Sequence, residues 1–408
     1  MVASHPQRRL WIILGIAVLG LTTTATTVTF FLPLVVAKVA PSNLAVGFAV
    51  GVEGFAALTV PLLVGQASDG TWTKYGRRLP YMLAATPLVL LGLVAIALLQ
   101  AYWLIVAAVV LFFIGYYAYY TAYQSLYPDT LDSHEYGRAW AYQSIFQGTG
   151  VALALLGGGA LLNAGLGAPF LASGVVFLII TLVSLRLIKE RRNGRPRQKL
   201  QIRTVLPIFY QRLQADRNLR LFLATHFLWE YTLAAIRAFV ILYLLNGLNL
   251  SKTELLPVLV VVILSYLIAS LVSGHIVDRF DPRQYTAGVV VLYAAGMIVA
   301  GTITDHAILS FLLPFGMFAG AAVLMLSYPI MLRVTPADRR GEYTGYYQFN
   351  RGLALLVGTS LTGWLIDRFG HFFPATDGFQ ILWISTGIAA ALSLIPFLAL
   401  TAASRQRA

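Results

Sequence analysis

The chain has 408 residues, of which 58% are hydrophobic and 11% are charged, and its mean hydropathy is +0.76. A soluble domain is about 45–50% apolar and about 25% charged, so this composition excludes a water-soluble protein. It also excludes a disordered chain, which requires low hydrophobicity. Apolar stretches of about 20 residues recur along the whole sequence and predict a polytopic α-helical membrane protein.

Twelve apolar segments are long enough to cross a bilayer as helices. In chain order they are residues 10–37, 44–64, 80–99, 102–125, 139–163, 167–187, 219–246, 253–277, 285–304, 307–332, 342–366 and 379–402. The first segment is too long for the apolar core of a signal peptide, so we expect it to be retained as a helix. An even number of crossings places both termini on the same side of the membrane.

The basic residues are distributed unevenly between the two sets of loops. Of the 29 Lys and Arg residues, 24 lie in the termini and loops of one side, while Lys38, Lys252 and Arg368 lie in loops of the other. Cytoplasmic loops are enriched in Lys and Arg, so we expect both termini in the cytoplasm. The predicted location is the plasma membrane, which in bacteria is the inner membrane. This bias also explains the net charge of +13 without a nucleic-acid partner.

Three short patterns recur in the same order in the two halves of the chain. They are Gly65-x3-Asp69 with Gly274-x3-Asp278, Tyr127-Pro128 with Tyr328-Pro329, and Gln147-Gly148 with Arg351-Gly352. Such a parallel repeat is typical of transporters whose site lies between two halves. We therefore predict an all-α fold of twelve transmembrane helices in two pseudo-symmetric six-helix bundles. The predicted bundles are residues 1–188 and 219–408, joined by a basic linker, 189–218, in which 205–213 could form an interfacial helix.

The loop after the second apolar segment carries a recognisable motif. It reads Gly65-Gln-Ala-Ser-Asp69-Gly-Thr-Trp-Thr-Lys74-Tyr-Gly76-Arg77-Arg78-Leu-Pro80. With twelve segments and an internal repeat, this loop resembles the major facilitator superfamily, and within it the sucrose:proton symporters and the glycoside–pentoside–hexuronide:cation symporters. The resemblance implies a transporter in which segments one, four, seven and ten surround the substrate.

Charged residues at the ends of the segments form a predicted conformational gate. A carboxylate in such a place can pair with Arg or lie at the N-terminus of a neighbouring helix, in one conformation only. The alternative is that these charges only fix topology and loop shape. The candidate residues are Asp69, Arg77, Arg78, Asp129, Arg138, Asp278 and Arg279. Gly363-x3-Asp367 repeats the motif at the other end of segment eleven, and we interpret it as an echo without a gating role.

Ionisable residues inside the apolar segments are candidates for proton coupling, because charges at that depth are costly. His226, Glu230 and Arg237 fall on one face of the seventh segment, since their helical directions lie within about 40° of one another. Glu53 lies in the second segment and Arg351 in the eleventh. A movement that changes the distance between a buried carboxylate and an Arg changes its proton affinity. The alternative is a static ion pair that holds helices together.

Amide and aromatic side chains in several segments suit a polyhydroxylated ligand, because amides bond its hydroxyls while rings cover its C–H faces. The candidate substrate-binding residues are Gln143, Gln147, Gln348, Asn350 and Trp229. The alternative for many Tyr residues near segment ends is the interfacial aromatic belt.

These features together predict a secondary transporter that alternates access by rocking two halves, with proton-coupled symport of a sugar or glycoside. Two alternatives remain open: a proton-driven exporter of amphipathic or drug-like compounds, for which Gly70 in the motif loop leaves room, and a non-transporting membrane scaffold or assembly factor. Neither a Gly-Lys-Ser/Thr phosphate loop nor zinc-ligand spacing is present, so we expect no enzyme, metal or cofactor. The expected partners are a small-molecule substrate, protons and the lipid bilayer, and the protein is expected to be a monomer.

Overall fold

The computed structural model of the protein describes residues 5–70, 73, 76–131, 136–188, 202–279, 282–335 and 340–400. The chain divides into two compact units, one formed by Met1–Ala40 and Ala56–Leu200, the other by Pro41–Phe55 and Gln201–Ala408. The border at Leu200 falls inside the predicted linker 189–218. The predicted domains 1–188 and 219–408 themselves stay a prediction, and residues 189–201 of the linker lie outside the described residues.

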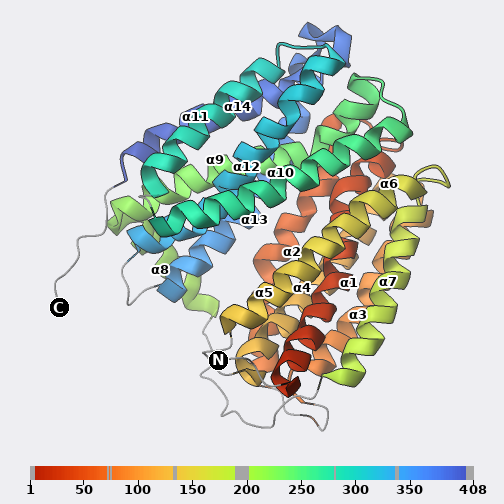
Figure 1. The fold of residues 1–408 in the computed structure, drawn as a ribbon, viewed down its shortest axis with the longest axis vertical. Coiled ribbons are helices and arrows are strands. Elements are labelled where there is room, and N and C mark those ends of the chain that lie inside the picture. The colour runs from red at the N-terminus through yellow and green to blue at the C-terminus, as the bar shows by residue number, and fades with distance from the viewer. Residues whose placement is uncertain are drawn as a thin grey trace. The chain divides into compact units, whose positions relative to one another are not determined.

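All twelve predicted segments are helical, and Figure 1 shows the helices along the chain. The first six are α1 (His5–Val36), α2 (Asn43–Asp69), α3 (Leu79–Leu98), α4 (Tyr102–Thr130), α5 (Tyr136–Ala152) with its continuation α6 (Gly158–Leu161), and α7 (Ala168–Leu187). A π-helical turn, Leu153–Gly157, joins α5 to α6. A helix is present in this region as α8 (Ile202–Ala215), and its interfacial position stays a prediction.

The second six segments form α9 (Arg217–Leu242), α10 (Lys252–Arg279), α11 (Pro282–Ala300), α12 (His306–Val334), α13 (Arg340–Phe369) and α14 (Gln380–Leu398). A π-helical turn at Tyr243–Gly247 extends α9. Asp216 caps the start of α9, because its carboxylate accepts a hydrogen bond from the backbone N–H of Leu219 at 3.1 Å. The capped start follows directly on α8, so the chain turns sharply from the linker helix into the first helix of the second bundle.

The two halves of the chain pack their helices in the same pattern, each within its own unit. In the first unit α1 contacts α5 and α7, and α3 contacts α4 and α7. In the second unit α9 contacts α13 and α14, and α11 contacts α12 and α14. These are the same pairs when the seventh segment is matched to the first, so the tertiary structure contains the repeat that the sequence patterns indicated.

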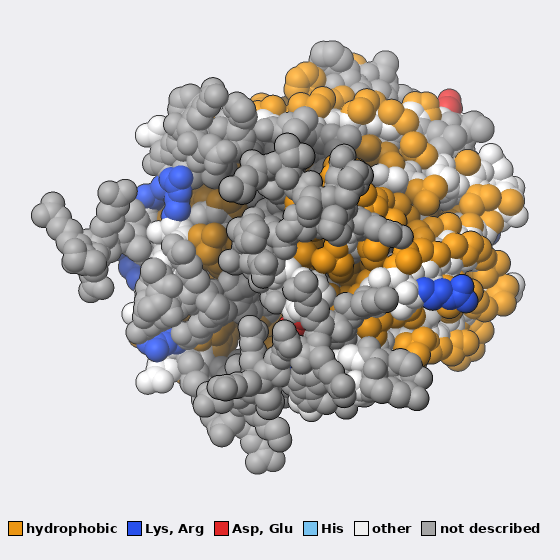
Figure 2. Space-filling view, turned by 60° about the horizontal axis from the view of Figure 1, so that its bottom comes forward, with side chains coloured by type: hydrophobic (Ala, Val, Ile, Leu, Met, Phe, Trp, Pro, Cys, Tyr) orange, Lys and Arg blue, Asp and Glu red, His pale blue; other side chains and the backbone are white. Residues whose placement is uncertain are grey.

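The outer surface of the bundles is apolar, which suits contact with lipid. Trp103 and Ile395 are each 70% exposed, and many other large apolar side chains are exposed on the same helices. In Figure 2, hydrophobic side chains make up most of the described surface in view, and Lys and Arg gather in a few places. Ten described helices are long and apolar enough to cross a membrane. The helical membrane fold is therefore confirmed.

The first half of α2 packs closely against α13 inside the second unit. Three glycines at spacings of four and three residues, Gly47, Gly51 and Gly54, face the α13 backbone around Thr359 and Gly352. A Cβ added at Gly47 would collide with the carbonyl oxygen of Thr359. Glycines at such spacing allow two membrane helices to approach closely, as in small-xxx-small contacts generally. A side chain at these positions would force the two helices apart.

The α2–α13 contact can be tested from the α13 side with Gly363→Ala. The new Cβ would collide with the carbonyl oxygen of Asn43, which is backbone and cannot turn away. We expect this overpacking to cost about 1–3 kcal/mol and to lower the apparent Tm of the detergent-purified protein. The matched control is Gly345→Ala on the same helix, where no atom lies within 4 Å of the added Cβ. Equal Tm values for the two variants would contradict the contact.

Candidate functional site

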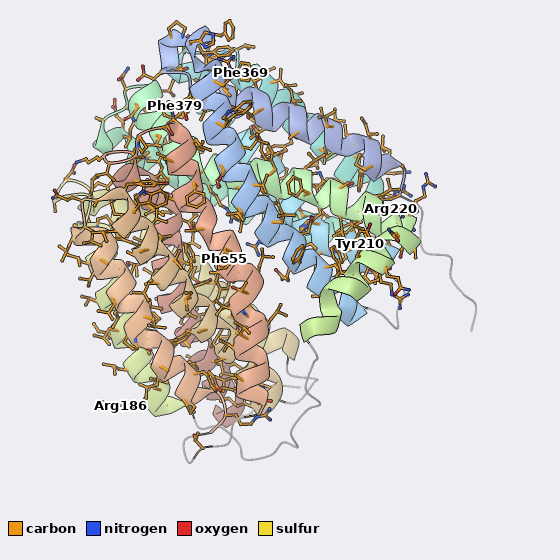
Figure 3. The ribbon with its side chains drawn as sticks, turned by 180° about the vertical axis from the view of Figure 1, so that it is seen from behind. Phe55, Arg186, Tyr210, Arg220, Phe369 and Phe379 are labelled. Atoms are coloured by element: carbon orange, nitrogen blue, oxygen red, sulfur yellow. The ribbon has the colours of Figure 1, made fainter. Side chains whose placement is uncertain are left out.

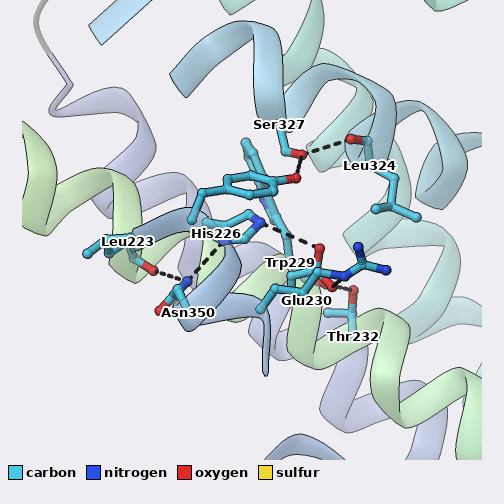
Figure 4. Close-up of polar contacts among 10 residues, drawn as sticks. Leu223, His226, Trp229, Glu230, Thr232, Leu324, Ser327 and Asn350 are labelled. Atoms are coloured by element: carbon cyan, nitrogen blue, oxygen red, sulfur yellow. Dashed lines mark hydrogen bonds and ion pairs between the residues drawn. The ribbon is translucent and has the colours of Figure 1, made fainter. Parts of the chain in front are cut away.

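A buried polar cluster lies in the second unit, where α9 meets α12 and α13 (Figure 4). At its centre is the carboxylate of Glu230, whose side chain is only 2% exposed. His226, one turn earlier on α9, places its Nε2 atom 3.5 Å from Oε1 of Glu230. Arg351 reaches from α13 and places its Nε atom 3.7 Å from Oε2 of Glu230. The single carboxylate is thus held between an imidazole and a guanidinium from two helices.

Asn350 fixes the protonation state of His226. Its side-chain amide nitrogen donates to the backbone carbonyl of Leu223 at 3.1 Å and lies 3.0 Å from Nδ1 of His226. The NH₂ group has two hydrogens, so one goes to the carbonyl and the other to Nδ1, which must then act as an acceptor. The remaining imidazole proton therefore resides on Nε2, directed at Glu230.

Aromatic rings and a short hydrogen-bond chain hold His226 in place. The ring of Tyr347 stacks on the imidazole at a centroid distance of 4.0 Å, and Phe222 stacks at 5.7 Å. The hydroxyls of Tyr347 and Ser327 are 2.8 Å apart, and Ser327 donates its single hydrogen to the carbonyl of Leu324. Tyr347 must therefore donate to Ser327. These contacts fix α12, α13 and α9 to one another around the imidazole.

The structure separates the predicted proton-coupling residues into two groups. His226, Glu230 and Arg351 come together, as the helical spacing on the seventh segment predicted for the first two. Arg237 and Glu53 are partly exposed, on α9 and α2 respectively. Arg237 acts on Glu230 only as a weaker, more distant charge than Arg351. The arginine beside Glu230 thus comes from α13, 121 residues away in the sequence, and no spacing rule could have selected it.

The predicted substrate-binding residues also differ in their surroundings. Asn350 belongs to the polar cluster. Trp229 is 1% exposed and faces α14, where its indole N–H donates to the hydroxyl of Ser393 at 2.9 Å; its role in substrate binding stays a prediction. Gln147 and Gln348 are exposed on α5 and α13. Gln143 is buried on α5, and its Oε1 atom accepts no hydrogen bond within the described residues.

Part of the predicted gate is an ion pair in the first unit. Nε of Arg78 lies 2.9 Å from Oδ2 of Asp129 at the end of α4, and the same guanidinium donates to the hydroxyl of Ser68 near the end of α2. Arg77 is buried beside it. This contact fastens the loop between α2 and α3 to α4. The remaining gate candidates, Asp69, Arg138, Asp278 and Arg279, have side chains that lie outside the described part of the structure.

Asp367 makes contacts that its sequence motif did not indicate. Its carboxylate accepts hydrogen bonds from the backbone N–H groups of Asn43 and Leu44, at 2.9 and 2.8 Å, and from the Asn43 side chain at 2.9 Å. Asn43 and Leu44 begin α2, whose free N–H groups and positive dipole end favour a carboxylate. Asp367 therefore extends the α2–α13 contact from the three glycines to the N-terminal end of α2. Its only signal in the sequence was the recurrence of Gly-x3-Asp.

Known proteins share both this sequence pattern and this fold. A sequence model of the Major Facilitator Superfamily matches residues 10–359 and, a second time, residues 234–407. The crystal structure of a bacterial homologue of the human lysosomal transporter Spinster, inward-facing and unoccupied, matches with a TM-score of 0.77 at 15% identity, over 98% of each chain. A crystal structure of the nucleoside transporter NupG, in a mutant form, matches with a TM-score of 0.78 at 12% identity, over 95% of this chain and 99% of that chain.

These matches identify the class of protein. The chain has the fold of a polytopic secondary transporter, and at these low identities the solved structures support the fold alone. The chain belongs to the Major Facilitator Superfamily, because the family match extends over most of its length. It is therefore a non-enzymatic membrane transporter for a small molecule. These matches do not place the chain in the branch of the sucrose and glycoside symporters, so that narrower assignment stays a prediction.

The role of Asn350 can be tested with Asn350→Leu. The variant leaves Nδ1 of His226 without its donor, so we expect a loss of about 1–3 kcal/mol in stability and a mixture of the two imidazole tautomers. The measurements are the apparent Tm and the ¹⁵N chemical shifts of labelled histidine, with the His226 signal assigned from His226→Gln. The control is Gln348→Leu, an exposed amide two residues earlier. An unchanged Nε2–H tautomer in Asn350→Leu would show that another contact fixes the ring.

Proposed function

We propose that the protein is a proton-coupled symporter in which Glu230 is the proton-binding group. The observation that supports this role most strongly is the burial of one carboxylate in a membrane-spanning helix, between a neutral imidazole N–H and an arginine from another helix. A buried charge of this kind is costly, and intramembrane carboxylates are typical of proton relays. Asn350 contacts Nδ1 of the imidazole and Tyr347 stacks on its ring, so both hold His226 beside Glu230.

Protonation of Glu230 provides a physical step for coupling. With Glu230 charged, the Coulomb attraction at 3.7 Å favours the conformation in which α13 holds Arg351 against α9. With Glu230 neutral, that attraction is lost. The side chain of Arg351 is 40% exposed, whereas that of Glu230 is 2% exposed, so the guanidinium can turn toward water while the carboxyl remains buried. A proton thereby changes the relative stability of two α9–α13 arrangements.

For the substrate we propose a sugar or glycoside, bound near the polar cluster. The buried amide of Asn350 and the exposed amide of Gln348 lie on one helix with Tyr347, and such groups bond ligand hydroxyls and cover C–H faces. A nucleoside is chemically also a glycoside, so the transported class of the structural neighbour NupG belongs in the same panel. The motif loop from Gly65 to Pro80 supports the same class by its resemblance to the sugar symporters.

The coupling role can be measured in proteoliposomes that contain a trapped pH-sensitive dye. We expect at least one member of a panel of mono- and disaccharides, neutral glycosides and nucleosides to drive proton entry with the wild-type protein. Glu230→Gln, which cannot bind the proton, should reduce substrate-driven proton entry to background while counterflow exchange of the same substrate persists. The matched control is Glu254→Gln, an exposed carboxylate that bonds Ser251 at the start of α10 and should leave the coupled flux unchanged.

Other results would favour the two alternative functions. Proton release coupled to movement of amphipathic compounds in the opposite direction would indicate an exporter. Absence of any coupled flux, together with stoichiometric co-purification of another membrane protein, would indicate a scaffold. Substrate-driven proton entry at the wild-type rate in Glu230→Gln would show that another group carries the proton.

We further propose that Asp367 acts as a latch in alternating access. Its hydrogen bonds to the start of α2 would stabilise the conformation in which α2 and α13 are in contact. Its carboxylate bonds two backbone N–H groups and one side chain at the start of α2, and these bonds exist only while α2 and α13 touch. Asp367 and Arg351 both lie on α13, so a movement of this helix changes both contacts. The sequence interpretation gave Asp367 no gating role, and the three hydrogen bonds are the reason to assign one.

The latch can be tested by the accessibility of the α2–α13 contact. The chain contains no cysteine, so Ser360→Cys introduces a single thiol beside Gly47. We expect slow labelling by a water-soluble maleimide in this background and several-fold faster labelling when Asp367→Asn is added, because the neutral amide loses its attraction to the helix N-terminus. The control is Asp377→Asn, an exposed position with φ of 47°, which asparagine tolerates. Equal labelling rates in the two double variants would contradict the latch.

A further inference from the structure

A hollow lies inside the second unit, away from the polar cluster. It lies at the end of α9 that carries the π-helical turn, among α9, α10, α11, α12 and α14, and it is partly open to the outside. Tyr243 lines it and lies thirteen residues beyond Glu230, about 20 Å along the helix axis. Figure 3 shows Phe379, which precedes α14, at the end of this unit opposite to Tyr210 on α8. The hollow is therefore separate from the site of proposed proton coupling.

The wall of the hollow is apolar except for two donors. Eleven of its thirteen lining residues are aliphatic, glycine or methionine, and the other two are Tyr243 and Trp383. These two side chains are 1% and 2% exposed, and their rings meet edge to face at 5.2 Å. Neither the hydroxyl of Tyr243 nor the indole N–H of Trp383 makes a hydrogen bond of good geometry among the described residues, although the two groups are close enough to interact with each other. Two buried donors thus share a space that contains no acceptor side chain from the described lining.

Pairing the two donors with each other cannot satisfy both. An indole N–H only donates, whereas a phenol hydroxyl donates one hydrogen and also accepts. Even if the ring of Trp383 turned to donate to Tyr243, the phenolic hydrogen would still lack an acceptor. A buried donor without an acceptor costs roughly 1–3 kcal/mol. The geometry therefore calls for an acceptor atom supplied from outside the lining.

The shape of the hollow results from missing side chains and from the π-helical turn. Gly296 of α11 lines it, and a Cβ added there would meet no atom within 4 Å. The π-helical turn at Tyr243–Gly247 places an extra residue in the last part of the α9 span, and such turns are frequent at functional sites. Any longer side chain at Gly296 would project into the free space.

We infer that this hollow binds the acyl chain and ester carbonyl of a membrane glycerolipid. The ester carbonyl is an acceptor without a donor of its own, which matches the two donors, and the methylene chain matches the apolar wall. The described lining contains no charged side chain, so the site recognises the acyl ester and not a charged headgroup. The helices that surround it are membrane spans, so glycerolipids are available there at high concentration.

The occupant can be detected through Trp383 with brominated lipid. The protein is reconstituted into vesicles of phosphatidylcholine with a dibrominated acyl chain, because bromine quenches indole fluorescence only at close range. The Trp383 signal is the difference between the wild type and Trp383→Phe, and the ring is too buried for contact with bulk lipid. We expect strong quenching of this signal that saturates at a low fraction of brominated lipid. An unquenched Trp383 signal would overturn the proposal.

Two variants separate specific binding from a change of fold. Gly296→Leu fills the hollow and should abolish the quenching, whereas Gly288→Leu, on the same helix and also without atoms within 4 Å of its Cβ, should leave it intact. Tyr243→Phe removes one donor and should weaken the apparent lipid affinity about fivefold, as expected for one hydrogen bond. Equal quenching in Gly296→Leu and Gly288→Leu, or no effect of Tyr243→Phe, would show that lipid does not enter or that water satisfies the donors.

Discussion

The charge of Glu230 is the constraint on which the rest of the second unit depends. An ionised carboxylate inside a membrane-spanning bundle is tolerated only with partners, and a lost partner would leave an uncompensated buried charge. His226 and Arg351 supply these partners from α9 and α13. Because Asn350 and Tyr347 then hold the imidazole, four side chains around one carboxylate determine how α9 packs on α13. In the proposed function, the same arrangement that stabilises the bundle also makes it sensitive to one proton.

α13 connects this cluster to the contact with α2. Arg351 and Asp367 are sixteen residues apart on the helix, about 24 Å along its axis. Between them the α13 backbone at Thr359 faces the glycines of α2, and the hydroxyl of Thr362 donates to that of Tyr231 on α9 at 3.2 Å. Because α13 is one continuous helix, a displacement of α13 at Arg351 also moves Asp367. The small residues of α2 allow this contact to form without interlocking side chains.

The two units share a helix pattern but not their polar chemistry. The first unit places its described ion pair, Arg78 with Asp129, at the ends of helices, and the carboxylate is the more exposed partner. In the Glu230–Arg351 pair of the second unit the carboxylate is buried and the guanidinium side chain is partly exposed. The two halves therefore share their helix packing, which depends on apolar periodicity, whereas these two ion pairs lie at different places in their units.

The sequence alone determined the membrane class, the twelve helical segments, the repeat and the pairing of His226 with Glu230, because apolar length, short recurring patterns and a one-turn spacing are local properties of the chain. Ten of the described helices are long and apolar enough to cross a membrane. Only the tertiary structure decided that Arg351 and not Arg237 faces Glu230, that Trp229 packs on α14, and that Asp367 caps α2. It also decided that Tyr243 and Trp383 share a hollow. Each of these facts depends on which faces of distant helices meet, and helix packing angles and side-chain fit are not encoded in any short stretch of residues.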